Sequence, residues 1–424
     1  MSNVARWLCM GLVVIVTGSG AARAEGAAAP AIGASVEELL DLARMMNPEL
    51  AATALEAEAA SARVEGADAL PDPRIQVTFD DISKNEAGLP GRSATYKYTM
   101  QQELPGWGKR AAKREIAEAG SREAVALREE RVAEVLMRVK TAYADYHRVH
   151  LSMDQTADLI QVLRALVELG RARYAQGMGL QAEVTSAEAE RGALTAELAR
   201  LEKERHRIRA RMNALVNRPS DAPVVEHPHL RPMPAETELE YGKLLERAMQ
   251  ANPALLSSRA KLEGADGETR LAAKNWVPDM GLAFGVVDRR NDGMRDGFEA
   301  MVSLNLPIQA GWRRAAEREA AAKKRAAGEW LSVARLHLES GLREALLSLE
   351  EARQVEKTAN EVLLPQARIA LQSSIKGYEA GSAESIAVLD AVQRLKKFQI
   401  ERIKAQFEQQ VRLAEIERFI GGEL

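Results

Sequence analysis

The amino-acid sequence predicts a mainly α-helical protein with four membrane-crossing β-strands, built from an internal duplication. Three observations predict this fold class. Segments of the first half return in the second half at a nearly constant offset, long proline-free stretches carry a heptad repeat, and four short segments alternate between apolar and polar residues. The composition agrees, because a chain with only 4% aromatic residues favours long helices over a large mixed core.

The duplication is visible in the register of matching segments. Asn47-Pro48 returns as Asn252-Pro253, an offset of 252 − 47 = 205 residues, and Tyr174 returns as Tyr378 at 378 − 174 = 204. A register kept over this length indicates two structurally equivalent halves. The period is far longer than the roughly 20–50 residues of solenoid repeats, so we predict a duplicated domain.

This register divides the chain into four parts. We expect a signal peptide at 1–24, a first structural repeat at 25–218, a proline-rich linker at 219–236 and a second structural repeat at 237–424. The signal peptide is indicated by Arg6, the apolar run after it and the small-x-small pattern Ala22-Arg23-Ala24. An uncleaved anchor helix is the alternative, but the apolar run is shorter than the roughly 20 residues of a membrane span.

Charge and cysteine content argue against several classes of protein. The net charge is −3, so no basic surplus points to nucleic-acid binding. Cys9 is the only cysteine, and cleavage of the signal would leave no thiol for redox chemistry or metal ligation. The chain contains no nucleophile elbow, phosphate loop or metal triad, so we expect no enzyme activity, no catalytic residues and no cofactor.

Histidines offer the remaining candidates for a metal site. His227-Pro228-His229 could form a ligand pair, but no third ligand lies nearby in the sequence and a solvated linker is favoured. His150 falls on a predicted helix seam, where a packed core residue is favoured. We therefore expect no metal site.

Long helices are predicted wherever proline is absent. Apolar and aromatic residues repeat in steps of four and three along the stretch 132–160, which is typical of a coiled-coil seam. Helix pairs are expected at about 109–176 with 180–217, and at about 313–376 with 382–420. The first of these helices would be roughly 100 Å long at 1.5 Å per residue, so it must lie against other rods. Pro365 is expected to kink the third helix.

The four alternating segments are predicted to be strands at about 73–82, 94–103, 278–287 and 298–307. Each has about the ten residues that a tilted strand needs to cross a bilayer, with one apolar and one polar face. Two soluble amphipathic hairpins are the alternative. Trp107, Trp276 and Trp312 argue against it, because an up-and-down arrangement places all three at one membrane boundary, as an aromatic girdle would.

Four strands cannot close on themselves in lipid. Unpaired backbone groups there cost several kcal/mol each, so closure requires more than one chain. Two chains would give an eight-stranded barrel filled by side chains, and three would give a twelve-stranded barrel wide enough for a lumen.

The sequence resembles the TolC-like outer-membrane efflux protein family. The resemblance covers both halves and is carried by the two Asn-Pro pairs, the run from Leu104 to Arg110, Leu306-Pro307, and the turn signatures 173–178, 378–381 and 388–391. It implies a homotrimer with a twelve-stranded barrel, four strands per chain, in the outer membrane of a Gram-negative bacterium. A long α-helical coiled-coil tunnel would continue the barrel through the periplasm.

The resemblance also implies partners and a function. Family members are exit ducts that receive substrates from an inner-membrane pump through a periplasmic adaptor protein, and they contact outer-membrane lipid. The run from Leu104 to Arg110 and the proline at Pro365 look like the branch that serves heavy-metal RND-type pumps, so metal cations are the expected substrates. A multidrug or type I protein-secretion duct is the alternative, followed by a periplasmic coiled-coil scaffold.

The resemblance assigns candidate site residues at the two turns between long helices. Tyr174, Gly177, Tyr378 and Gly381 would form the adaptor-docking turns, and glycine there suits a turn that excludes a Cβ. Asp390, Glu183 and Tyr378 would form the periplasmic gate. The sequence departs from the family pattern at Ala383 and Ala387, where an arginine and an aspartate would be expected.

Overall fold

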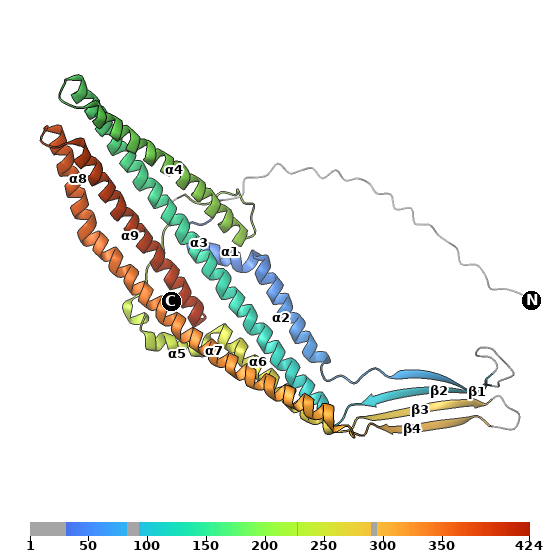
Figure 1. Cartoon of the computed structure of the whole chain (residues 1–424). Coiled ribbons are helices and arrows are strands. Elements are labelled where there is room, and N and C mark those ends of the chain that lie inside the picture. The colour runs from blue at the N-terminus through green and yellow to red at the C-terminus, as the bar shows by residue number, and fades with distance from the viewer. Residues whose placement is uncertain (1–30, 83–92, 227, 290–294) are drawn as a thin grey trace, which may run out of the picture.

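The computed structural model describes residues 31–82, 93–226, 228–289 and 295–424, so the predicted signal peptide lies outside the described residues. The described chain is an elongated rod with a sheet at one end and two helical turns at the other (Figure 1). It is mainly helical with one four-stranded sheet, which confirms that part of the predicted fold class.

Both halves of the chain follow the same order of elements. The first half comprises α1 (Val36–Met46), α2 (Pro48–Gly66), β1 (Arg74–Ile82), β2 (Ser93–Leu104), α3 (Lys109–Ala175) and α4 (Gln181–Leu215). The second comprises α5 (Tyr241–Ala251), α6 (Pro253–Ala273), β3 (Met280–Arg289), β4 (Gly297–Leu304), α7 (Ala310–Thr358), α8 (Leu364–Glu379) and α9 (Ser385–Ile420). Short 3₁₀ turns lie at Glu236–Glu238 and Lys274–Trp276.

Several element boundaries differ by up to three residues from the sequence expectation, and two of the differences have a local physical reason. A π-helical turn at Ala359–Leu363 separates α7 from α8, directly before Pro365. Proline lacks an N–H and clashes with the carbonyl four residues earlier, so the wider turn accommodates it where we expected a kink. The last strand ends at Leu304, three residues before the predicted 307. The Asn305 amide still donates to the carbonyl of Asp279, 3.0 Å away, in register with the ladder, but Pro307 has no N–H with which to continue the pairing.

The sheet is antiparallel in the order β1-β2-β3-β4, so its middle pair joins the two halves of the chain. Its register sorts side chains onto two faces. The apolar face carries Ile75, Val77, Phe79, Tyr96, Tyr98, Met100, Met280, Leu282, Phe284, Val286, Phe298, Ala300, Val302 and Leu304. Most of these side chains are exposed in the single chain, Ile75 and Phe298 at 79% each. The opposite face is mostly polar.

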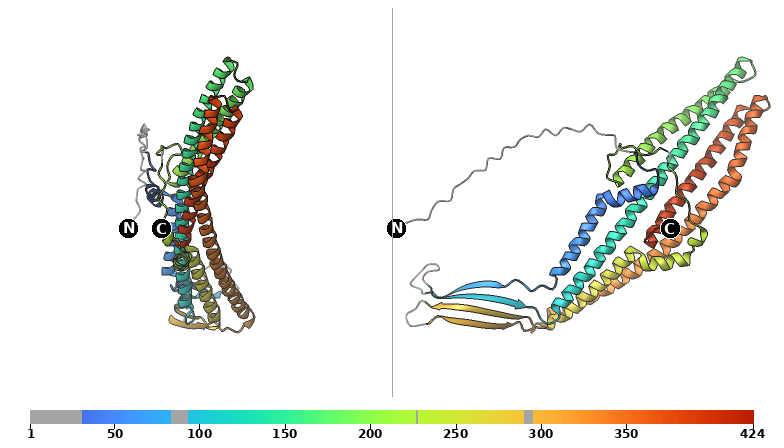
Figure 2. Two further views of the ribbon diagram at one scale, coloured as in Figure 1. Left: turned by 90° about the vertical axis from the view of Figure 1, so that its left-hand side faces the viewer. Right: turned by 180° about the vertical axis from the view of Figure 1, so that it is seen from behind.

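The helices lie side by side in two tiers along the rod (Figure 2). Near the sheet the order is α2, α3, α6 and α7; toward the turns, α4 packs on α3, and α9 packs on α3, α7 and α8. Thus α3 runs through both tiers, and α7 and α8 together do the same. The buried seam of α3 includes Val139, Tyr143, Tyr146 and His150, and the His150 ring lies against Tyr146 at 4.4 Å between centroids. Among the described helices, none is long and apolar enough to cross a membrane.

Two asparagines join the tiers end to end. The Nδ2 of Asn47 donates to the carbonyl of Leu215 at the end of α4 (2.8 Å), while its Oδ1 accepts from the first turn of α2. Asn252 does the same between Phe419 on α9 and Leu255 on α6, at 2.9 Å for each bond. Each asparagine therefore satisfies one helix C-terminus and one helix N-terminus. Proline follows at the first position of the new helix, where its missing N–H costs nothing.

The run from Leu104 to Arg110 forms the elbow between the sheet and α3. Gly106 passes so close to the second half that a Cβ would lie 2.6 Å from the carbonyl of Pro278, and Gly108 adopts a positive φ of 80°. Asp279 accepts hydrogen bonds from the Gly106 amide and the Lys109 ammonium, both at 2.7 Å. The glycines are therefore required by close approach and by backbone conformation.

A buried ion-pair network ties the linker to both halves. Glu417 on α9 accepts from Lys140 on α3 at 2.9 Å and from both terminal nitrogens of Arg231, at 2.7 and 2.9 Å. The side chains of Lys140 and Glu417 are only 6% and 4% exposed. Burial alone would raise the pKa of Glu417, but the hydrogen bonds and charges of Arg231 and Lys140 hold it below its usual value.

Candidate functional site at the helical turns

The two turns at the far end of the rod share a backbone device but differ in side-chain environment. Gly177 and Gly381 have φ values of 72° and 76°, a conformation that L side chains rarely adopt. Tyr174 and Tyr378 occupy equivalent positions before them, yet Tyr174 is 51% exposed and Tyr378 is 1% exposed. The repeats are therefore not equivalent at the candidate site.

Tyr378 is buried because the other half of the chain surrounds it. Its hydroxyl donates to Glu183 on α4 at 3.1 Å, and the guanidinium of Arg173 lies 4.8 Å from its ring centroid. Arg173 also donates to the carbonyl of Tyr378 and, at 3.2 Å, to the carbonyl of Met178 in the first turn. These contacts connect the α3–α4 turn with the α8–α9 turn.

The electrostatics keep Tyr378 neutral. Burial, the charge of Glu183 and the hydrogen bond to it all raise the pKa of Tyr378 above its usual value. A neutral phenol retains the proton that it donates to the carboxylate. Gly170 lies against this phenol: a Cβ there would be 3.4 Å from the phenol oxygen and 3.3 Å from a methyl carbon of Val184.

The sequence interpretation named Tyr378 and Glu183 but gave Arg173 no role. Arg173 lies in the turn signature that carried the family resemblance, yet the equivalent residue in the second half is Gly377. The presence of a charged residue, Arg173, in only one copy of the repeat was the one sequence signal that it has a specific role. Its stacking on a tyrosine 205 residues away could not be read from local pattern.

Asp390 does not join this cluster within the chain. It lies on α9 with its side chain 59% exposed, and it pairs with Arg394 at 2.6 Å, one turn along the same helix. Ala387 is exposed on the same stretch of α9, and Ala383 packs against Gly377 beside the turn. A role for Asp390 in a gate between copies of the chain stays a prediction.

The three tryptophans lie at the helical end of the sheet. Trp107 is 88% exposed, Trp312 is 51% exposed and Trp276 is 37% exposed. The guanidinium of Arg313 lies over the rings of Trp276 and Trp312, at 5.7 and 4.6 Å from their centroids. The structure thus brings two of them together through one arginine, while their membrane role stays a prediction.

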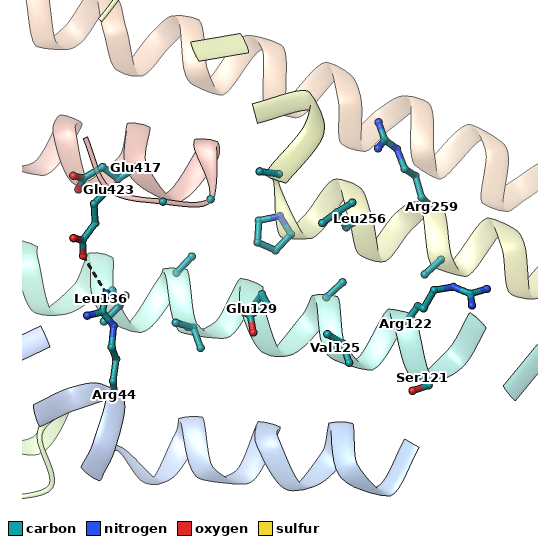
Figure 3. A pocket seen from close by; sticks show the side chains of 18 of the residues that line it. Arg44, Ser121, Arg122, Val125, Glu129, Leu136, Leu256, Arg259, Glu417 and Glu423 are labelled. Carbon is teal, nitrogen blue, oxygen red and sulfur yellow. Dashed lines mark hydrogen bonds and ion pairs between the residues drawn. The ribbon is translucent and has the colours of Figure 1, made fainter. Parts of the chain in front are cut away.

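The rod also has a hollow of about 890 Å³ along α3 and α6, away from the turns (Figure 3). Val125, Leu136 and Leu256 supply apolar lining, and an ion pair of 3.1 Å between Arg44 and Glu423 lies at one end. Across the ranges that the structure describes, no group of three or more histidine, cysteine or acidic residues could hold a metal ion. His227 of the candidate ligand pair lies outside those ranges.

Together, the two-tiered helical rod, the two-faced sheet and the paired turns define an outer-membrane channel fold. The crystal structure of VceC from Vibrio cholerae superimposes with a TM-score of 0.79 at 20% identity, covering 92% of this chain and 96% of that one. The model of the family described as "Outer membrane efflux protein" matches residues 39–218 and 244–422. The chain belongs to this family, whose members are channels and not known enzymes, and its location is the outer membrane.

Two relatives of this chain carry names that refer to metals. The chain is 26% identical to the cobalt-zinc-cadmium resistance protein CzcC of Cupriavidus metallidurans, across 85% of this chain and 84% of that protein. It is 25% identical to the nickel-cobalt-cadmium resistance protein NccC of Alcaligenes xylosoxydans, across 75% and 70%. These similarities agree with the branch that the sequence resemblance indicated.

Proposed function

We propose that this chain forms a homotrimeric exit duct that passively conducts metal cations out of the cell. In this arrangement three sheets form a twelve-stranded barrel in the outer membrane, and the helices form a periplasmic tunnel. An RND-type inner-membrane pump delivers the cations through a periplasmic adaptor protein.

The two-faced sheet with open edges carries the proposal. Within the described part of a single chain, β1 and β4 each present an unpaired edge, and the apolar face is largely exposed. A monomer in water would leave the backbone groups of both edges without sheet partners and the apolar face in contact with water. Lipid against the apolar face and other copies along the edges would satisfy them, with the polar face lining a lumen. Three copies give the twelve strands that leave a lumen open, whereas two would give a barrel filled by side chains.

The ends of the rod suit the two contacts that such a duct makes. Trp107, Trp276 and Trp312 would mark the periplasmic boundary of the membrane, where aromatic rings concentrate. The turns at Gly177 and Gly381, with Tyr174 and Tyr378, would dock the adaptor. Tyr378, Glu183 and Asp390 would form the gate, with the hydrogen bond from Tyr378 to Glu183 favouring a closed arrangement.

The names of the relatives and the metal-efflux resemblance support metal cations as substrates. A duct for drugs or polypeptides is the second candidate, because one tunnel can serve different pumps. Deleting the gene should sensitise cells to zinc, cobalt, nickel or cadmium salts and leave drug tolerance and protein secretion unchanged. Drug sensitivity without metal sensitivity would contradict the metal assignment.

The oligomer is tested separately. The mature protein should fractionate with the outer membrane and migrate as a trimer that heating converts to monomer, since it has no disulfide. Cross-linking in native membranes that yielded only monomer would contradict the proposed duct.

A further inference from the structure

A column of glutamates runs along α4 at a spacing of seven residues. Residues seven apart lie on the same face of a coiled-coil helix, so these side chains form one stripe, roughly 30 Å long at 1.5 Å per residue. The column consists of Glu183, Glu190, Glu197 and Glu204. Its first member is the acceptor of the Tyr378 hydroxyl at the candidate gate. The column therefore begins at the gate and continues along α4, away from the turns.

The next two glutamates bind α9 in the other half of the chain. Glu190 accepts a hydrogen bond from the amide nitrogen of Gln393, and Glu197 accepts one from the ammonium of Lys396. These bonds join residues 203 and 199 positions apart in the sequence. The fourth glutamate instead accepts from Arg148 on α3 at 2.5 Å, within the first half. Contacts between the halves along this stripe thus extend from the gate to Glu197.

These bonds connect two helices that make few other direct contacts. Both α4 and α9 pack mainly on α3 and only weakly on each other. Their buried apolar side chains, such as Leu194 and Leu395, belong to a core that α3 shares. A movement of α9 away from α4 therefore has to break the hydrogen bonds of the column.

We infer that Glu190 with Gln393, and Glu197 with Lys396, form a latch that holds the α8–α9 pair against the α3–α4 pair and limits opening of the duct. These are positioning residues, and the inference rests on the proposed duct and its gate. The latch adds contacts well beyond the gate itself. Its last bond lies 197 − 183 = 14 residues, or roughly 20 Å, farther along α4 than the glutamate of the gate.

The bond between Glu197 and Lys396 should contribute most to the latch. Both partners are charged, and their side chains are each only 20% exposed, so the bond is partly shielded from water and salt. Gln393 is an uncharged donor at an exposed position, so its bond to Glu190 should be weaker. Removing Lys396 should therefore open the duct more than removing Gln393.

The experiment records single channels of the mature protein in planar bilayers. Lys396→Glu places two carboxylates against each other, and the ratio of open to closed time should rise roughly 3- to 10-fold, the effect of losing one net hydrogen bond. Gln393→Ala should give a smaller rise. Lys397→Glu is the matched control, because it makes the same charge change at the next residue of α9, where the side chain is exposed.

Two further variants distinguish a latch from a general loss of structure. Lys396→Arg keeps both the charge and a donor, so it should behave like the wild type. Glu197→Lys combined with Lys396→Glu forms the same ion pair with its charges exchanged. This double variant should return the ratio of open to closed time toward the wild-type value, because the coupling between the two positions is restored.

The outcomes separate this inference from the proposed function. Heat-sensitive trimers on gels verify that each variant assembles. If the wild-type protein forms no pores, the proposed duct is wrong. If it forms pores that Lys396→Glu opens no more than Lys397→Glu does, or that the exchanged pair does not restore, the duct stands and the latch is wrong. If Lys396→Glu does not assemble, Gln393→Ala decides, and an unchanged ratio for that variant contradicts the latch.

Discussion

Replacing Asn252 tests whether the rod depends on asparagines that join helices end to end. Asn252 is 7% exposed; its Oδ1 caps α6 through Leu255, and its Nδ2 holds the carbonyl of Phe419 at the end of α9. Asn252→Ala removes both bonds. Loss of an N-cap costs about 1 kcal/mol, and a carbonyl left without its partner costs about 1–3 kcal/mol when buried, so the partly buried carbonyl of Phe419 should lie toward the low end. We expect the free energy of unfolding to fall by about 2–3 kcal/mol.

A second substitution separates the two bonds. Asn252→Asp keeps an oxygen that can cap α6, but it places a carboxylate against the carbonyl of Phe419 and removes the donor. Its stability should fall between the wild type and Asn252→Ala. Gln250→Ala, at an exposed position on α5 two residues away, is the matched control and should change little.

The assay is urea unfolding of the mature protein in detergent, followed by far-UV circular dichroism at one protein concentration. Asn47→Ala in the first half should reproduce the loss, because Asn47 bonds to Leu215 and α2 in the same way. If Asn252→Asp were as stable as the wild type, the bond to Phe419 would contribute nothing and the reasoning would fail.

Three further predictions concern the gate, the ion-pair network and the sheet. Tyr378→Phe removes the donor to Glu183, so single-channel conductance in planar bilayers should rise; an equal rise for Glu168→Gln, an exposed carboxylate on α3, would place the constriction elsewhere. Glu417 has a lowered pKa in the folded chain, so the stability it contributes is present above its unfolded pKa and is lost as pH falls through the folded value. Glu417→Gln should therefore reduce stability at neutral pH and flatten the acid limb of a thermal-melting profile. Leu282→Arg should destabilise the assembled trimer by about 2–4 kcal/mol if the apolar face meets lipid near the midplane. Ala283→Arg, on the polar face, should have a milder effect. Equal yields of trimer on gels for the two variants would contradict a lipid-facing role.

Local periodicity made much of the fold predictable. The face on which a strand or helix residue lies depends on its spacing from its neighbours, so alternation and heptads are readable without coordinates. The sequence predicted a mainly helical chain with four two-faced strands, and it placed the first long helix within one residue of its observed end at Ala175. The end of β4 was less predictable, because the apolar–polar alternation continues to Leu306, beyond the last paired residue, Leu304.

The candidate site was predictable only in part, and the reason is distance along the chain. The Asn-Pro pairs were visible in the sequence as a repeat. Their asparagines join α4 to α2 and α9 to α6 by hydrogen bonds to carbonyls at least 167 residues away, which the sequence did not reveal. Tyr174 and Tyr378 look alike in sequence, and only Arg173 and Glu183 folding around the second one bury it. The sequence by itself determined which residues share a face, because that is a local property. The tertiary structure decided which faces, charges and helix ends meet, because those contacts join segments that no local pattern relates.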